Sequence, residues 1–288
     1  MNPALFRHEA MATHFEITIA GHPEAYARQA AGAAFRELDR LEGDLSRYIE
    51  SSDIGRANRL GFGESIAIGD DALNCLLLAA GLAESTGHAF DPAYGSIRDE
   101  GTSRETPPFT LDPDSHRLSS RSSRLHLDLG AVGKGYALDR LAETLSEWGV
   151  SSALLNSGGS TVLALEPATP TGGWPVGIGE GMARREIPLR KAALSGSGIS
   201  VKGAHLVDPR TGGPAFRALR AWAQAESAAV ADALSTAFFV MADEEVRAYC
   251  EAHPEIGAAL ALSDGRLDLL GSLASHSDPS GSRQNPTA

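Results

Sequence analysis

The order of strand-like and helix-like segments is the feature that most constrains the fold of this chain. Alternating polar and apolar residues over 13–21 predict a strand, and apolar residues at helical spacing predict helices over 23–48 and 70–87. Short strands follow residue 152, interrupted by one buried helix over 228–242. Because strands and helices do not alternate strictly, a doubly wound parallel sheet is disfavoured. We predict an α+β protein with mixed sheets and packed helices, in two intimate lobes with the active site between them.

Length and composition fit one such domain. The chain has 288 residues, of which 42% are hydrophobic, enough for a substantial core. Residues 99–123 are polar and rich in Ser, Pro and Thr, which predicts a surface excursion with one short hairpin and a soft boundary between the lobes. We expect a single domain over 1–274 and a disordered tail over 275–288.

Charge, cysteine content and hydropathy exclude several classes of protein. The net charge of −12 argues against sequence-independent binding to nucleic acid, which depends on basic patches. Cys75 and Cys250 are far apart and no Cys/His cluster accompanies them, so a structural zinc site is not expected. We see no membrane span, signal peptide or lipidation cysteine, and therefore expect a cytoplasmic protein, or an exported one if a leader has been removed.

The segment DLGAVGKGYALD, residues 128–139, is unusually rich in glycine around Lys134. It fails the P-loop pattern, because Asp128 and Gly135 occupy positions that require Gly and Ser or Thr. Glycine is common where a backbone comes close to another group, so we ask what approaches Lys134. Lys134 opens a predicted helix, where free N–H groups favour anions. The alternative is a turn with a solvated lysine.

A second polar cluster lies in ADALSTAFF, within the apolar helix predicted over 228–242. Asp232 and Thr236 are four residues apart and share one face of that helix. A buried carboxylate is costly unless it is paired or binds a cation. A carboxylate with a hydroxyl is oxygen ligation that suits Mg²⁺, with water and phosphate completing the shell. The alternative is that Asp232 caps the N-terminus of its own helix.

Three further segments combine glycine with polar residues. In HLVDPRTGG, Asp208 precedes Pro209 and is expected to form a turn, while His205 is either a ligand-facing group or a hydrogen-bonded core histidine. GHAFDP (87–92) and NSGG (156–159) are either loops beside a ligand or simple turns.

Taken together, five ordered blocks resemble the FAD:protein FMN transferases, the ApbE-like family, from Met11 to about Leu270. They are MATHFEI, LSRYIESSDIGRAN, GHAFDP, DLGAVGKGYALD, and HLVDPRTGGP followed by ADALSTAFFVM. The resemblance implies Mg²⁺-dependent transfer of the FMN half of FAD to a Thr or Ser hydroxyl of an acceptor protein, with release of AMP. FAD and the acceptor protein are the expected partners.

The resemblance also implies residue roles. Those implied to contact FAD are Met11, Tyr48, Ala89, Phe90, Asp91, Asp128, Lys134 and Val207. Those implied to surround Mg²⁺ are the Ala131 carbonyl, Asp232, Ser235 and Thr236. On this view the glycines let the main chain near Ala131 approach the metal, while Lys134 faces the nucleotide. Asp232 and Thr236 are expected to be catalytic, and His205, at a strand end beside Val207, is expected to act as the general base.

Two serines depart from the pattern of the family, and the polar segment near residue 100 stands where family members commonly carry Trp-Gly-Phe after the FDP block. The family often has Asp after the Gly pair, where this chain has Ser160. The family often has SGD where this chain has SGS, residues 195–197, so Ser197 replaces an Asp. The rival interpretations are an FAD pyrophosphatase, in which water replaces the acceptor, and an FAD carrier without activity. The presence of Asp232 and Thr236 speaks against the carrier.

Overall fold

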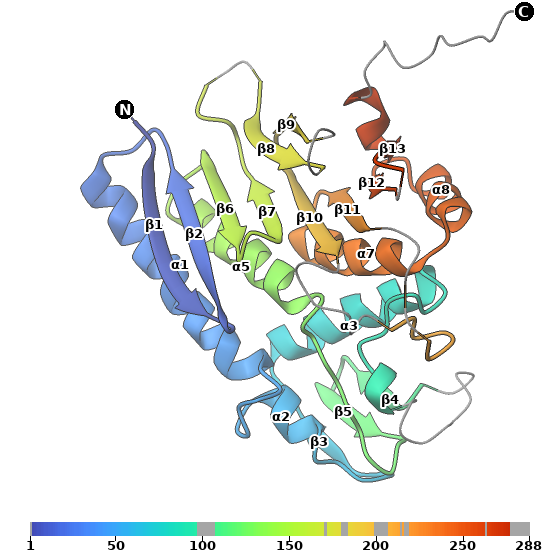
Figure 1. Ribbon diagram of the computed structural model, residues 1–288. Helices are drawn as coiled ribbons and strands as arrows, with labels where there is room; N and C mark the ends of the chain where they lie inside the picture. Colours follow the sequence, from blue (N-terminus) through green and yellow to red (C-terminus); the bar gives the residue numbers. More distant parts are fainter. Residues whose placement is uncertain are drawn as a thin grey trace, which may run out of the picture.

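A computed structural model describes residues 2–96, 107–169, 172–179, 184–198, 207–213, 215, 219–262 and 264–276. Its centre is an eight-stranded sheet of order β1-β2-β6-β7-β10-β11-β12-β13, in which every pairing is antiparallel (Figure 1). The strands are β1 (Ala4–Ala10), β2 (Thr13–Ile19), β6 (Ala153–Ser157), β7 (Thr161–Ala164), β10 (Ala192–Gly198), β11 (Arg220–Ala225), β12 (Gly257–Ala261) and β13 (Leu267–Gly271).

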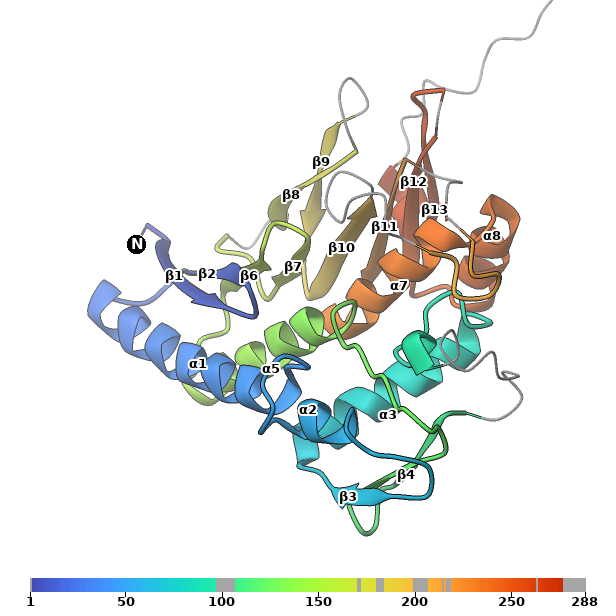
Figure 2. The same ribbon diagram turned by 60° about the horizontal axis from the view of Figure 1, so that its bottom comes forward.

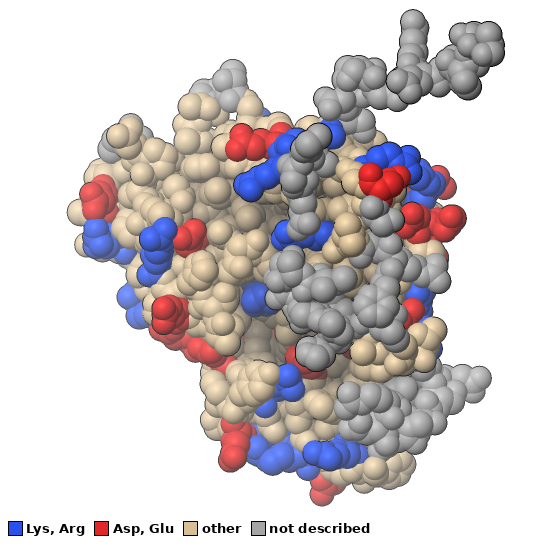
Figure 3. Space-filling view, viewed as in Figure 1, with Lys and Arg blue, Asp and Glu red and all other residues tan. Residues whose placement is uncertain are grey.

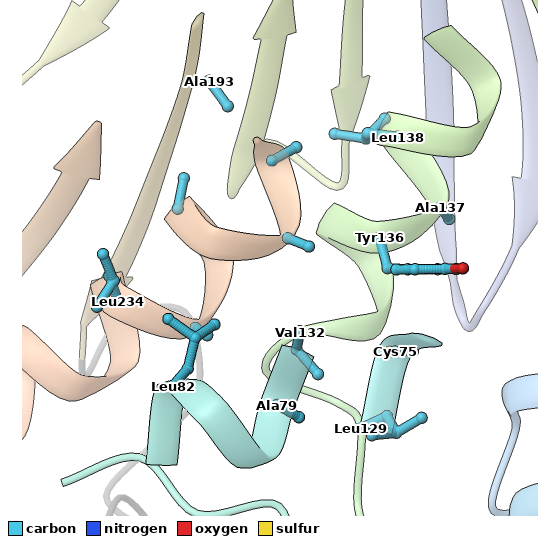
Figure 4. Packing of buried hydrophobic residues seen from close by; sticks show 14 of the residues in the cluster. Cys75, Ala79, Leu82, Leu129, Val132, Tyr136, Ala137, Leu138, Ala193 and Leu234 are labelled. Atoms are coloured by element: carbon cyan, nitrogen blue, oxygen red, sulfur yellow. The ribbon is translucent and has the colours of Figure 1, made fainter. Parts of the chain in front are cut away.

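Helices cover one face of this sheet in two layers. The first layer holds α1 (Glu24–Leu45), α5 (Gly133–Glu147) and α7 (Ala228–Val240), and α3 (Asp70–Ser85) lies beneath them, as Figure 2 shows. Figure 4 shows Ala79 and Leu82 of α3 in the same apolar cluster as Leu138 of α5 and Leu234 of α7. The α+β class predicted from the sequence is confirmed.

The opposite face of the sheet is partly covered by a hairpin of β8 (Trp174–Ile178) and β9 (Arg185–Leu189). Trp174 and Ile187 from this hairpin form a second apolar cluster with Trp222 of β11. The described residues also include α2 (Asp53–Ala57), α8 (Asp243–Ala252), the 3₁₀ helix η2 (Ser272–His276) and a short helical stretch at 94–96.

A small sheet of order β3-β5-β4 lies below the helices. Its strands are β3 (Ser65–Ala67), β4 (Phe109–Asp112) and β5 (Arg117–Ser120), and β4 pairs with β5 as a hairpin. This is the hairpin predicted within 99–123, of which residues 99–106 lie outside the described part of the chain. Residues 277–288 of the predicted tail also lie outside it, and the domain boundaries stay a prediction.

Charged side chains join the three helices beneath the sheet. Asp71 of α3 accepts hydrogen bonds from Arg40 of α1 (2.5 Å) and from the hydroxyl of Tyr136 of α5 (2.8 Å), and its carboxylate lies 3.1 Å from Nε of Arg140. Burial alone would raise the pKa of Asp71, but these bonds and the charges of the two arginines outweigh it and lower that pKa. The ionised carboxylate therefore stabilises this junction.

Three details differ from the prediction. The first strand, β1, was not predicted. The helix predicted over 23–48 has an apolar stripe from Ala34 to Tyr48, but α1 ends at Leu45 and Tyr48 is 78% exposed. The alternation in RLHLDL, residues 124–129, predicts a strand, but these residues pair with none. Instead, the side-chain amide of Asn58 takes the place of a neighbouring strand, donating to the carbonyl of Leu127 (2.9 Å) and accepting from its N–H (2.6 Å).

Candidate active site

A cavity of about 1230 Å³ opens where the helix layer meets the part of the chain that carries the small sheet. Figure 3 shows this face of the molecule hollowed near its middle, with basic and acidic side chains around the opening. The wall comes from the β1–β2 turn, the end of α1, residues 89–95, residues 126–134, the loop at 207–209 and α7. Segments distant in the sequence therefore form one site.

The β1–β2 turn places Met11 in the wall of the cavity. Met11 and Ala12 have φ values of 51° and 57°, as the tight turn of a hairpin requires at both central positions. Such values are strained for residues other than glycine. The carboxylate of Glu42 on α1 accepts a hydrogen bond from the N–H of Met11 (2.8 Å) and holds the strained turn against the helix.

Arg47, Tyr48 and Asp128 line the mouth of the cavity. The guanidinium of Arg47 lies over the ring of Tyr48, 4.4 Å from its centroid, and its Nε lies 3.4 Å from Oδ2 of Asp128. A flat cation stacked on an exposed aromatic ring provides a surface for a planar ligand.

The GHAFDP block turns the chain into the cavity after α3. His88 has a φ of 62°, and the following Ala89, Phe90 and Asp91 all line the cavity. Oδ1 of Asp91 accepts the N–H of Ala93 (2.8 Å), and Oδ2 lies 3.2 Å from Nδ1 of His88. These contacts fix the orientation of the Asp91 carboxylate.

The loop at 207–213 contributes Val207 and Pro209 to the wall of the cavity. Asp208 forms the predicted turn, because its carboxylate accepts the N–H of Arg210 (2.8 Å) and its carbonyl accepts the N–H of Gly212 (2.9 Å). The guanidinium of Arg210 then reaches Glu245 on α8 (2.7 Å), which anchors the loop to the helix layer.

Lys134 lies in the cavity wall at the start of α5. Its Nζ donates to the carbonyl of Gly130 (2.9 Å) and lies 3.7 Å from Oδ2 of Asp232. The expectation that the neighbouring glycines serve a ligand is wrong for Gly135. A Cβ atom on Gly135 would collide with the carbonyl group of Ala228 and lie 2.8 Å from Cα of Ala229, so the group that approaches is the backbone of α7.

Asp232 is only 2% exposed, and each of its oxygens has polar partners. Oδ2 accepts the N–H of Gly135 (3.2 Å), and Oδ1 accepts the hydroxyls of Thr161 (3.3 Å) and Ser195 (3.4 Å). The alternative that Asp232 caps its own helix is wrong, because α7 begins at Ala228 and Ser227 is its N-cap. A carboxylate within this helix, facing a lysine, fits a role in ligand binding.

A cluster of buried hydroxyls connects Asp232 to the sheet. Thr161 lies 2.9 Å from Ser195, and Ser197 lies 2.9 Å from Ser235 and 3.2 Å from Thr236 (oxygen to oxygen). Thr236 lines the cavity, whereas Ser235 is fully buried among these hydroxyls and does not line it. Thus Ser197, one of the two departures from the family pattern, lies within this cluster, next to Thr236.

The other departure lies in the turn between β6 and β7. The hydroxyl of Ser160 donates to the carbonyl of Ser157 (3.2 Å), and the N–H of Gly158 donates to the backbone carbonyl of His14 (2.9 Å). NSGG is therefore a tight turn, and none of its residues lines the cavity. The buried hydroxyl of Ser157, which faces Thr161 across the β6–β7 pairing, has no hydrogen-bond partner among the described residues.

The donor chemistry at this point fits Mg²⁺. No group of three His, Cys, Asp or Glu residues suited to a metal occurs in the described ranges, so a metal here would depend on oxygen donors of other kinds. The Asp232 carboxylate, the Thr236 hydroxyl and the Ala131 carbonyl are the hard oxygen donors that Mg²⁺ takes, with water and phosphate oxygens completing the shell. Ala131 and Thr236 both line the cavity.

The cavity gathers most of the residues predicted from the sequence. All eight predicted FAD-contacting residues line it, namely Met11, Tyr48, Ala89, Phe90, Asp91, Asp128, Lys134 and Val207. His205 lies outside the described residues. Sequence reasoning missed Glu42, Arg47, Tyr94 and His126, which also line the cavity. Arg47 lies inside the block LSRYIESSDIGRAN and His126 inside the alternating segment RLHLDL, whereas Glu42 gave no signal beyond the polar face of its helix.

Curated proteins resemble this chain over most of its length. A FAD:protein FMN transferase of Rhodobacter capsulatus is 27% identical over 81% of this chain, which spans only half of that relative. Another FAD:protein FMN transferase, from Treponema pallidum, is 26% identical over 85% of this chain and 80% of its own length.

Solved structures share the fold. The flavin transferase ApbE of Vibrio cholerae superposes with a TM-score of 0.83 at 21% identity, covering 94% of this chain and 98% of that one. The ApbE protein of Thermotoga maritima superposes with a TM-score of 0.78 at 23% identity, covering 93% and 97%. A family model described as the ApbE family matches residues 11–260. The chain therefore belongs to the ApbE family, as the five sequence blocks predicted.

Proposed function

We propose that this chain transfers the FMN moiety of FAD to a Thr or Ser hydroxyl of an acceptor protein and releases AMP. One observation carries the proposal: the eight residues that the sequence blocks predicted to contact FAD come from five separate blocks of the chain and all line one cavity. Relatives at 26–27% identity are named FAD:protein FMN transferases, which supports the same chemistry.

In the proposed reaction the acceptor oxygen attacks the FMN-side phosphorus of FAD. A new phosphodiester bond forms, the bond from that phosphorus to the bridging oxygen breaks, and the bridging oxygen leaves with AMP. Catalysis of such a transfer rests mainly on positioning and on stabilising charge. Lys134 would hold a phosphate oxygen, and the stacked Arg47–Tyr48 pair at the mouth would support a planar ring of the substrate.

We also propose that the reaction requires Mg²⁺, held by Asp232, Thr236 and the Ala131 carbonyl. The charge of the site supports this. Glu42, Asp91 and Asp128 line the cavity together with Arg47 and Lys134, and Asp232 adds a fourth carboxylate behind Lys134. A pyrophosphate brought to this site meets more negative than positive charge, so a divalent cation would neutralise the excess. That Ser235 also holds the metal stays a prediction.

His205 is proposed as the base that accepts the proton of the acceptor hydroxyl. It precedes Val207, a residue of the cavity wall, by two positions. The replacement His205→Ala should leave FAD binding intact and lower the transfer rate by about 10²- to 10⁴-fold. An unchanged rate with an unchanged pH profile would assign the base elsewhere.

The deciding experiment incubates the protein with FAD and Mg²⁺, with and without a co-expressed acceptor protein, and follows AMP by chromatography and added FMN by mass spectrometry. Release of AMP only with the acceptor, together with the FMN mass on it, is expected. Release of AMP without acceptor would indicate an FAD pyrophosphatase, and FAD binding without AMP would indicate a carrier. Removal of Mg²⁺ with a chelator tests the metal requirement in the same assay.

A further inference from the structure

Asp139, the last residue of the glycine-rich segment, lies on α5 but caps a different helix. Its Oδ1 accepts the N–H of Ala228 (2.7 Å), and its Oδ2 accepts the N–H of Ala229 (2.9 Å) and the hydroxyl of Ser227 (2.7 Å). These are the groups that open α7, which begins at Ala228. One carboxylate on α5 therefore binds the first two N–H groups of α7 and the hydroxyl of its N-cap residue, Ser227.

The capping is reciprocal. Asp232, one turn after Ala228 on α7, accepts the N–H of Gly135 in the first turn of α5 (3.2 Å). Asp139 stands one turn after Gly135 on α5, so each helix offers a carboxylate to the start of the other. Between these two contacts, the missing side chain of Gly135 lets the backbones of α5 and α7 touch. The contacts of Asp139 and Asp232, with the close backbone packing at Gly135, oppose sliding of α5 and α7 along each other.

The residues of the proposed reaction stand on both sides of this crossing. Lys134, beside Gly135 on α5, faces Asp232 on α7 at 3.7 Å, and Thr236 lies one further turn along α7. Any axial shift of α7 would move Asp232 and Thr236 together relative to Lys134. A displacement of about 1 Å at a reacting centre can cost about 100-fold in rate.

We propose that Asp139 is a positioning residue for the reaction: by capping α7 from α5, it sets the placement of Asp232 and Thr236 relative to Lys134. This inference rests on the proposed function. It assigns a role to the final Asp of DLGAVGKGYALD, which does not line the cavity.

The test compares Asp139→Ala and Asp139→Asn with Tyr26→Phe as the matched control. The hydroxyl of Tyr26 donates to the carbonyl of Trp148 (2.6 Å) at the far end of α5, so its removal weakens the same helix without touching the crossing. Per folded molecule, Asp139→Ala should lower kcat for AMP release about 10- to 100-fold while KM for FAD stays within about threefold. Asp139→Asn keeps one acceptor oxygen, so its kcat should lie between those of Asp139→Ala and the unmodified protein. Tyr26→Phe should have the kcat of the unmodified protein.

Amide hydrogen exchange supplies a readout that does not depend on activity. In Asp139→Asn, the amides of Ala228 and Ala229 should exchange faster, and so should the amide of Gly135, which bonds Asp232 rather than Asp139. If Asp139→Ala does not fold, Gly135→Ala disturbs the same crossing sterically and should show the same fall in kcat.

Two results would overturn the proposal: unchanged protection of the Gly135 amide in Asp139→Asn, or a loss of kcat no greater than that of Tyr26→Phe. If the unmodified protein releases no AMP, the proposed function fails, and the exchange of Gly135 still decides whether Asp139 positions the crossing.

Discussion

Nζ of Lys134, in the cavity wall, lies 3.7 Å from Oδ2 of the buried Asp232 behind it. The lysine belongs to the start of one helix and the aspartate to the middle of another. Each side chain also bonds the main chain around α5, Lys134 to Gly130 and Asp232 to Gly135. The charges of the site are thus held by backbone as well as by each other.

Replacement of Lys134 by Ala should weaken FAD binding about tenfold or more at low salt, as expected for the loss of a charge-assisted hydrogen bond to a phosphate. The difference from the unmodified protein should shrink at high salt, because screening weakens the attraction in the protein that retains the lysine. Fluorescence titration of both proteins with FAD at two salt concentrations measures this difference in affinity. Equal affinities at low salt would show that Lys134 does not face the nucleotide.

Replacement of Asp232 by Asn should abolish Mg²⁺-dependent AMP release, with a fall of about 100-fold or more, because size is kept and the charge that would hold the cation is lost. FAD binding should change little, since the predicted FAD contacts come from other segments. Thr161→Ser is the matched control, because it keeps the hydroxyl that bonds Asp232. Near-normal release by Asp232→Asn would contradict a role in metal binding.

Replacement of Asn58 by Ala should destabilise the protein by about 1–3 kcal/mol, because the N–H and C=O of Leu127 lose their partners. Most of the next residues of that segment, from Asp128 to Lys134, line the cavity, so FAD binding should weaken as well. Asn58→Asp, which can accept but not donate, should lie between. Urea unfolding and FAD titration measure the two effects, and an unaltered midpoint for Asn58→Ala would refute the account of this segment.

Acid should remove the contribution of Asp71 to stability. Its pKa is lower in the folded protein than in the unfolded chain, so the ionised carboxylate stabilises the fold above the unfolded value of about 4, and this stability is lost as pH falls through the folded pKa. The urea midpoint of Asp71→Asn should therefore lie below that of the unmodified protein near pH 7. The gap should narrow below about pH 4, and a gap independent of pH would contradict this assignment.

Prediction from the sequence succeeded where a pattern is local. The apolar stripe from Ala34 to Tyr48, buried except for Tyr48, found α1, and the five blocks found residues of the cavity wall. Prediction failed where a residue distant in the sequence determines the local structure. Residues 124–129 alternate as a strand does, but the side chain of Asn58, instead of a neighbouring strand, hydrogen-bonds the backbone of Leu127. Gly135 resembled a ligand-binding glycine, although its neighbour is the backbone of α7. Neither partner could be inferred from spacing along the chain.

None of the helices in the described part of the chain is long and apolar enough to cross a membrane. Charge predicted no affinity for nucleic acid, and that expectation stays a prediction. His205 and the tail also stay predictions, because they lie outside the described residues.

The pairing of β2 with β6 has a consequence for how the protein is made. Every helix from α1 to α5 and the whole small sheet lie between these two strands in the chain. During synthesis the β1–β2 hairpin leaves the ribosome long before β6 exists, so the inner edge of β2 has no partner in the meantime. Unpaired strand edges on nascent chains invite association with other chains. The inner edge of β2 therefore stays unpaired throughout the synthesis of residues 20–152.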